Sequence, residues 1–328
     1  MRCRVVWCAL TVFTALGTAT AQSDEWQRLM SQGNTQTRAG SYKEAAATFR
    51  EAVRVAEQSG SGDIRLAKSM NGLAIAYDEL GQSGDAERCY RRALSLMAAT
   101  SGKDSPDYAK LLSNMGAFYT EQGRPAKAEE LAREAVAIYA HAVPRDELAL
   151  ALAENCLADV LVRNRDYQDA DRLLNEALRA LNEQPGKGTE LLGITLNNLG
   201  AVRRFQGRME EATQMFEQAI GIFEISLTAE HPIVLRSLNN LGIVYAACGR
   251  NHEADVTFQR AVQVAETHLG KEHPVYGRIL RNYADFLRKT GRKAEAKAAE
   301  AESKAALAAS ARRNGVGMTV DVSSFRQE

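Results

Sequence analysis

Eight asparagines recur along this sequence at regular intervals, and their amides could hold the backbone of an extended peptide. They form two rows whose members are 42 residues or a multiple of 42 apart: Asn71, Asn155, Asn197 and Asn239, then Asn114, Asn198, Asn240 and Asn282. A primary amide is both donor and acceptor, so a row of amides can pair with a peptide backbone whatever its sequence. Asparagine is a poor residue for a helix interior, so its recurrence needs a reason. The alternative role is to bridge neighbouring structural units.

Basic residues near these asparagines would add selectivity for an anionic ligand. Arg236 and Arg278 lie 42 residues apart. The second half of the chain is rich in such cations and holds fewer anions, namely Arg163, Arg204, Arg236, Arg278, Arg288 and Lys289 against Asp159 and Asp285. The first half is mixed, with Asp78, Glu79 and Glu121 facing Lys68 and Lys110. We therefore expect the eight asparagines, Arg236 and Arg278 to bind an extended or acidic segment, or a chain-terminal carboxylate.

Histidine and cysteine form no catalytic or metal-binding pattern. His231 and His273 each precede a proline, and the start of a helix explains both. Beyond the first 21 residues the cysteines are Cys89, Cys156 and Cys248, which are far apart and lack C-x-x-C spacing. That spacing predicts neither a disulfide framework nor a zinc site. We expect each cysteine to be a small buried residue within a helix.

One short segment superficially suggests a phosphate-binding loop. Residues 185–189 read Pro-Gly-Lys-Gly-Thr, but the motif needs a glycine where Leu181 stands and a hydroxyl residue where Gly188 stands. The segment is therefore predicted to be a linker. The sequence also lacks a Gly-x-Ser-x-Gly motif. We predict no catalytic residues, no metal and no cofactor.

A repeat of 42 residues would position the asparagines. Small residues recur at this fixed step: Ala74, Gly116, Ala158, Gly200 and Gly242. In each repeat a second set of recurring landmark residues follows, which for Gly242 are Ala254, Phe258 and Ala261. Small residues let paired helices approach closely, while aromatic and leucine residues fill the flanks. Weaker copies of the pattern lie around Phe49 and Ala284, so the chain reads as an array of helical hairpins.

Turn residues separate the two helices of each repeat. A glycine stands at this point in six repeats, where a helix must end in a left-handed residue: Gly40, Gly81, Gly123, Gly207, Gly249 and Gly291. The fourth repeat has Arg165 instead, so its turn departs from the pattern.

Helical geometry divides the first helix of each repeat into two faces. When the small residue is numbered 8, a step of 100° per residue places positions 4, 7, 8 and 11 on a core face. Positions 2, 5, 6, 9 and 13 lie opposite, on a groove that includes both asparagine rows. Arg203 occupies core position 11, where it would either extend to solvent or contact a ligand.

The landmarks resemble the tetratricopeptide repeat, and in particular the 42-residue type of kinesin light chains and their bacterial relatives. The segments Leu-Asn-Asn-Leu-Gly (196–200 and 238–242) and the His-Pro pairs carry this resemblance. It implies an all-α, right-handed superhelical solenoid of about seven helix-turn-helix repeats, with a concave groove that holds peptides. The repeats would lie near 24–63, 64–105, 106–147, 148–189, 190–231, 232–273 and 274–310.

The two ends of the chain differ from the repeats. Two arginines, an apolar run from Val5 to Gly17 and the small residues Ala19-Thr20-Ala21 predict a signal peptide over 1–21, cleaved before Gln22. The apolar run would rise about 20 Å as a helix, short of the roughly 30 Å hydrocarbon core. An uncleaved membrane anchor is the alternative. Lys293 to Arg313 reads as a capping helix, and 311–328 as a flexible C-terminal tail.

Composition narrows the choice of function. Lys plus Arg equals Asp plus Glu at 41 each, so no global field favours nucleic acid or an anionic membrane. We expect an exported protein, periplasmic or secreted, without a membrane span after cleavage, that binds a protein or peptide segment and catalyses nothing. A scaffold of an envelope complex acting through its convex face, or an accessory subunit of an enzyme, is the alternative.

Overall fold

The computed structural model describes residues 22–37, 41–58, 64–184, 186–226 and 232–313, and all regular secondary structure within them is helical. The all-α prediction is therefore confirmed. The predicted signal peptide over 1–21 lies outside the described residues, as does the predicted tail beyond residue 313. The predicted capping helix is present as α14 (Lys293–Arg313).

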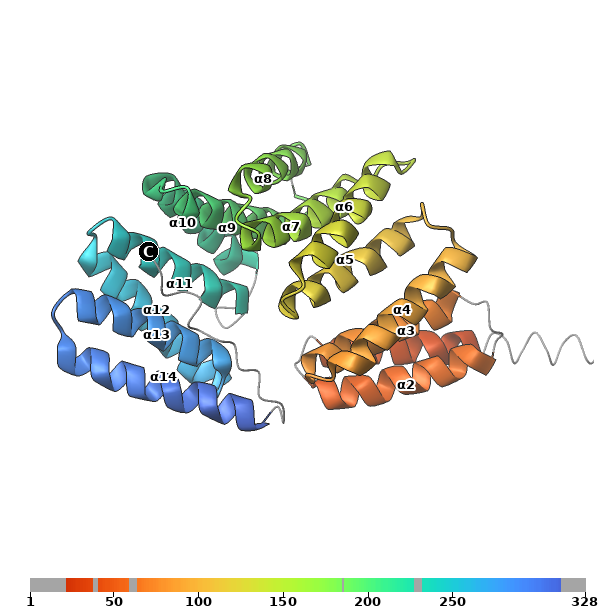
Figure 1. Ribbon diagram of the computed structural model, residues 1–328, viewed down its shortest axis with the longest axis horizontal. Coiled ribbons are helices and arrows are strands. Elements are labelled where there is room, and N and C mark those ends of the chain that lie inside the picture. The colour runs from red at the N-terminus through yellow and green to blue at the C-terminus, as the bar shows by residue number, and fades with distance from the viewer. Residues whose placement is uncertain (1–21, 38–40, 59–63, 185, 227–231, 314–328) are drawn as a thin grey trace, which may run out of the picture. The chain divides into compact units, whose positions relative to one another are not determined.

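The helices follow the predicted order of hairpins (Figure 1). Residues 22–37 form the first helix. The others are α2 (Tyr42–Gln58), α3 (Ile64–Glu79), α4 (Ser83–Thr100), α5 (Pro106–Glu121), α6 (Pro125–His141), α7 (Glu147–Arg163), α8 (Tyr167–Asn182), α9 (Thr189–Phe205), α10 (Met209–Ser226), α11 (Pro232–Ala247), α12 (Asn251–Leu269), α13 (Pro274–Lys289) and α14.

These helices fall into two compact units, which the uniform repeat of the sequence does not predict. Unit 1 spans Met1–Arg145, and unit 2 spans Asp146–Glu328. In the described part of unit 1 the hairpins are residues 22–37 with α2, α3 with α4, and α5 with α6. In unit 2 they are α7 with α8, α9 with α10, α11 with α12, and α13 with α14. Within unit 2 the first helices α7, α9, α11 and α13 also contact one another in sequence.

In the fifth and sixth repeats the hairpin is closed by a large side chain of the second helix that packs against a small residue of the first. A Cβ at Gly200 would lie 2.9 Å from the Phe216 ring, and one at Gly242 would lie 3.0 Å from the Phe258 ring. Phe216 and Phe258 are 0% and 1% exposed. The small landmark residues are thus required by the close approach of two helices, as their spacing predicts.

The turn of the fourth repeat keeps its left-handed geometry without glycine. Arg165 has φ 63°, close to the 65° of Gly123 at the same place in the third repeat. A left-handed conformation costs a residue with a Cβ about 1–2 kcal/mol. The tertiary contacts of α7 with α8 therefore hold this turn in a conformation that its own residue disfavours.

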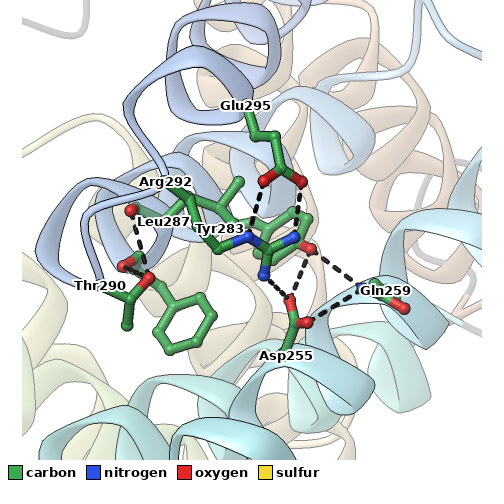
Figure 2. Close-up of polar contacts among 8 residues, drawn as sticks. Asp255, Gln259, Tyr283, Leu287, Thr290, Arg292 and Glu295 are labelled. Carbon is green, nitrogen blue, oxygen red and sulfur yellow. Dashed lines mark hydrogen bonds and ion pairs between the residues drawn. The ribbon is translucent and has the colours of Figure 1, made fainter.

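Polar contacts join neighbouring repeats at the turns, as Figure 2 shows for the last repeat of unit 2. Arg292, which follows the turn glycine, contacts Asp255 of α12 through Nη1 at 2.8 Å. It also pairs with Glu295 through Nε at 2.8 Å and Nη2 at 2.6 Å. The Tyr283 hydroxyl donates to the same Asp255 carboxylate at 2.7 Å. One carboxylate of α12 thereby binds both the first helix and the turn of the next hairpin.

The same arrangement explains Arg203, whose place on the core face departs from the repeat pattern. In unit 1 the Tyr119 hydroxyl donates to Glu87 of the preceding repeat at 2.6 Å. Arg203 occupies the repeat position of Tyr119, and its Nη1 lies 2.6 Å from Asp171, the counterpart of Glu87. An ion pair therefore replaces the tyrosine hydrogen bond, and Arg203 joins two neighbouring repeats of unit 2.

Acidic side chains gather at the end of α3 in unit 1. Burial, together with the neighbouring Glu121 of α5 and Glu79, raises the pKa of Asp78 to about 7. The hydroxyls of Tyr42 from α2 and Tyr90 from α4 also lie near this group of carboxylates. The native state therefore holds a proton on Asp78 between about pH 4 and 7, whereas the unfolded chain has released it.

We predict that unit 1 becomes more stable as the pH falls through 7, because the native state then binds a proton that the unfolded state lacks. Asp78→Asn removes the buried charge and should stabilise the protein at pH 8 by about 1 kcal/mol, a figure discounted for partial exposure. That is roughly 2–4 °C in Tm. The gain should fall to roughly half at pH 5.5 and vanish only below about pH 4, where the unfolded chain also holds the proton, in thermal unfolding followed by circular dichroism. Glu130→Gln, on the exposed surface of α6, is the control, and an equal gain at both pH values would contradict the assignment.

Candidate functional site

The two asparagine rows meet in pairs between neighbouring repeats. The Asn114 amide donates to the Asn71 carbonyl oxygen at 3.0 Å in unit 1. In unit 2 Asn198 donates to Asn155 at 3.0 Å, and Asn282 donates to Asn239 at 2.9 Å. The bridging role that was the alternative to ligand binding is therefore present in the fold. Each pair still leaves part of its hydrogen-bonding capacity, since an amide can make up to four hydrogen bonds.

Two of the predicted groove asparagines are buried inside unit 2. Asn155 is 3% exposed and Asn197 is 2% exposed. The Asn155 amide donates to the Ala151 carbonyl at 2.8 Å and to the Thr195 hydroxyl at 2.9 Å. The Asn197 carbonyl oxygen accepts from the Ser237 hydroxyl at 2.8 Å. The structure thus places these two residues in the interface between first helices, away from any open groove.

Asn240 differs from the other second-row asparagines. Within the described residues its side chain makes no hydrogen bond. By its repeat position Asn240 would donate to the Asn197 oxygen, as Asn282 donates to Asn239, but that oxygen already accepts from Ser237. The side chain is only partly buried. Its donor and acceptor are therefore both available to a ligand.

Arg236 and Arg278 carry positive charge that the described part of unit 2 does not pair. Neither has an ion pair there, and partial desolvation lowers the pKa of both guanidiniums although both residues are exposed overall. Asp159 of α7 acts favourably on Arg236, but Asp159 is already bound to Arg163 at 3.2 Å. Two cations thus share one carboxylate, and Arg278 lies near a second arginine, Arg281. This surface has an excess of positive charge.

Unit 1 contains a cavity of about 460 Å³ between its first helices. Apolar and polar side chains line it in similar number: Trp26, Met30, Asn34, Thr37, Phe49, Lys68, Asn71, Gly72, Ile75, Met97, Asp107, Lys110, Leu111 and Asn114. Lys68 is paired with Asp107 at 3.1 Å. The sequence pattern did not single out Trp26 and Met30, because the first repeat lacks the apolar residues that flank its small position elsewhere.

The described residues also include cysteines and other potential metal ligands. Cys89, Cys156 and Cys248 are free and only half-buried, and burial raises the pKa of the Cys156 thiol to about 11. Among the described residues no group of three or more His, Cys, Asp or Glu side chains is arranged to hold a metal ion. None of the helices in that part of the chain combines the length and apolar character that crossing a bilayer requires.

We predict that Asn198→Ala and Asn240→Ala differ in their effect on stability. Asn198→Ala leaves the buried Asn155 oxygen without its donor, which should cost about 1–3 kcal/mol. Asn240→Ala removes no bond within the described residues and should stay within about 0.5 kcal/mol. Urea unfolding of the two variants measures both values. Equal losses would show that the two asparagines have the same structural role.

Comparison with known proteins agrees with this architecture. The sequence profile of the tetratricopeptide repeat matches residues 28–99, 84–141, 149–225 and 233–309. No curated protein sequence matches the chain significantly. Among solved structures, BtubC (BKLC) from P. vanneervenii is 24% identical with a TM-score of 0.54, over 75% of this chain and 92% of that one.

Two further structures show the same fold. A putative kinesin light chain from Podosopora anserina, with nearly identical repeats, is 23% identical with a TM-score of 0.51, over 65% of this chain and 99% of that one. The apo form of RapI is 16% identical with a TM-score of 0.55, over 76% and 98% of the two chains. The repeat profile spans most of the sequence, and its hairpins are present in both units. The chain belongs to the tetratricopeptide repeat family, and its fold is similar to that of kinesin-light-chain-like repeat proteins.

Proposed function

We propose that this protein is an exported, non-catalytic adaptor whose unit 2 binds an acidic, extended segment of a partner protein. The tetratricopeptide fold generally serves protein–protein interaction, which supports the adaptor role. The observation that carries the ligand class is the set of Arg236, Asn240 and Arg278. These residues lie on the contacting helices α11 and α13, and none has an ion pair or side-chain hydrogen bond within the described residues.

Each member of this set supplies a different part of the interaction. Arg236 and Asn240 are four residues apart on α11 and so share a face of that helix. The Asn240 amide can accept from one backbone N–H and donate to one carbonyl of an extended peptide. Arg236 and Arg278 are partly desolvated, which strengthens their attraction for a carboxylate relative to fully hydrated cations. An acidic segment matches all three residues.

Unit 1 offers a separate surface for the same kind of ligand. The Asn71–Asn114 pair lines the cavity, and its single bond leaves the Asn71 amide nitrogen and the Asn114 oxygen available. Trp26, Ile75 and Leu111 give that cavity an apolar wall. We assign it to a partner segment that brings an apolar side chain beside its backbone.

We predict that variants of the unit 2 set weaken peptide binding without loss of folding. Peptides selected from a random dodecapeptide phage library against the protein from Gln22 onward should be rich in Asp and Glu. Asn240→Ala should weaken their binding about 2- to 12-fold, the equivalent of one hydrogen bond. Arg236→Glu and Arg278→Glu should weaken it further, and the loss should shrink at high salt. Fluorescence polarisation with labelled peptides measures the affinity.

Arg179→Glu is the matched control, since Arg179 is exposed on α8, the second helix of its hairpin. It should leave affinity unchanged. Selected peptides without acidic residues, or affinities that the three substitutions leave intact, would overturn the proposal and favour a scaffold that uses its convex face. An activity that arises only in a mixture with an enzyme would instead favour the accessory-subunit role.

Export is supported by the sequence of residues 1–21, which lie outside the described residues. We predict that the protein recovered from an exporting host begins at Gln22, because Ala19 and Ala21 supply the small residues that signal peptidase recognises. Intact-mass spectrometry of the recovered chain measures this directly. Full-length protein in the membrane fraction would contradict cleavage and support an anchor.

A further inference from the structure

Two aromatic rings stack at the turn edge of unit 2. Tyr167 is the first residue of α8, and Phe205 is the last residue of α9. Their ring centroids are 5.1 Å apart with an interplanar angle of 8°. Phe205 is nevertheless 45% exposed, which is unusual for a large apolar side chain in this chain. Its outward surface is thus rigidly held and open to solvent.

The guanidinium of Arg204 lies over this ring and has no carboxylate partner among the described residues. Its Cζ is 4.1 Å from the Phe205 ring centroid. Its Nε is buried without an acceptor, and within the described residues the side chain makes no ion pair or hydrogen bond. Burial lowers the pKa of Arg204, and the Tyr167 hydroxyl offsets this only in part. The side chain as a whole is only partly buried.

The neighbouring arginines show that this lack of a partner is specific to Arg204. Arg203 pairs with Asp171 at 2.6 Å, and Arg208 pairs with Glu211 at 2.6 Å. Three cations therefore face two carboxylates. The last turn of α9 adds a partial negative charge of about half a unit, too small to balance Arg204. The site keeps a net positive charge next to an exposed ring.

We propose that Arg204 and Phe205 form a subsite for the carboxylate of an Asp or Glu side chain in a bound peptide. The guanidinium would donate to the carboxylate, while the Phe205 ring packs against the methylene groups or an apolar neighbour of that side chain. Tyr167 is a positioning residue, because its ring fixes the Phe205 plane. The subsite rests on the proposed binding of an acidic segment and adds an anchor on α9 beyond Arg236, Asn240 and Arg278.

A double-mutant cycle tests the subsite. The probe is the tightest acidic dodecapeptide selected from the phage library, with each Asp or Glu replaced in turn by Asn or Gln. Arg204→Gln should weaken binding of the parent peptide roughly 10- to 150-fold, the range of a hydrogen-bonded charge. At one acidic position of the peptide the effects should be coupled. Its replacement should weaken binding to the parent protein but cost little further affinity when the protein carries Arg204→Gln. Arg204→Lys should restore only part of the affinity, because lysine lacks the planar fork.

The thermal stability of the variants distinguishes a ligand-binding role of Arg204 from a purely structural one. Arg204 has no ion pair or hydrogen bond among the described residues, so Arg204→Gln should leave Tm unchanged or raise it while it weakens binding. In the matched control, Arg203→Gln breaks the Asp171 ion pair and should lower Tm. A lowered Tm for Arg204→Gln, or additive effects at every acidic position, would overturn the subsite. If Arg236→Glu still weakens binding in that case, the proposed function stands without it. A phosphoserine that binds more tightly than the coupled acid would overturn the assignment to a carboxylate.

Discussion

The Phe216 ring lies where a side chain at Gly200 would otherwise be, and the Phe258 ring takes the same place at Gly242. This close approach sets the distance between the two helices of a hairpin. It also fixes the rotation of each first helix, because the small residue must face its partner. Once that face is fixed, the asparagines two and three positions earlier are directed toward the neighbouring repeat. The later polar contacts depend on this packing.

Most of the amides are used to join repeats. The buried Asn155 makes bonds to Ala151, Thr195 and Asn198, so removal of one partner leaves a buried polar atom unsatisfied. Such a network specifies how repeats align, and it limits what the same side chains can offer a ligand. Asn240 is an exception because Ser237 satisfies Asn197 in its place. One serine thereby releases an amide for binding.

The unpaired arginines follow a different principle from the paired ones. Arg203 and Arg292 each bind a carboxylate of the preceding repeat and strengthen the array. Arg204, Arg236 and Arg278 are partly desolvated without such a carboxylate. A cation in that state lowers the stability of the free protein and gains most from an external anion. This property underlies the proposed binding of an acidic segment.

The 42-residue spacing determined the helical hairpins, because small residues such as Gly200 and Gly242 serve a local contact between adjacent helices. It also indicated that Arg165 replaces a turn glycine. The sequence could not decide which asparagines are free, since that depends on which repeat supplies a competing hydroxyl, as Ser237 does for Asn197. Nor could it separate Arg203 from Arg204, which are adjacent in sequence. Only the tertiary structure places Asp171 beside one of them and leaves the other without a carboxylate, because ion pairs between repeats depend on distances that spacing along the chain does not fix.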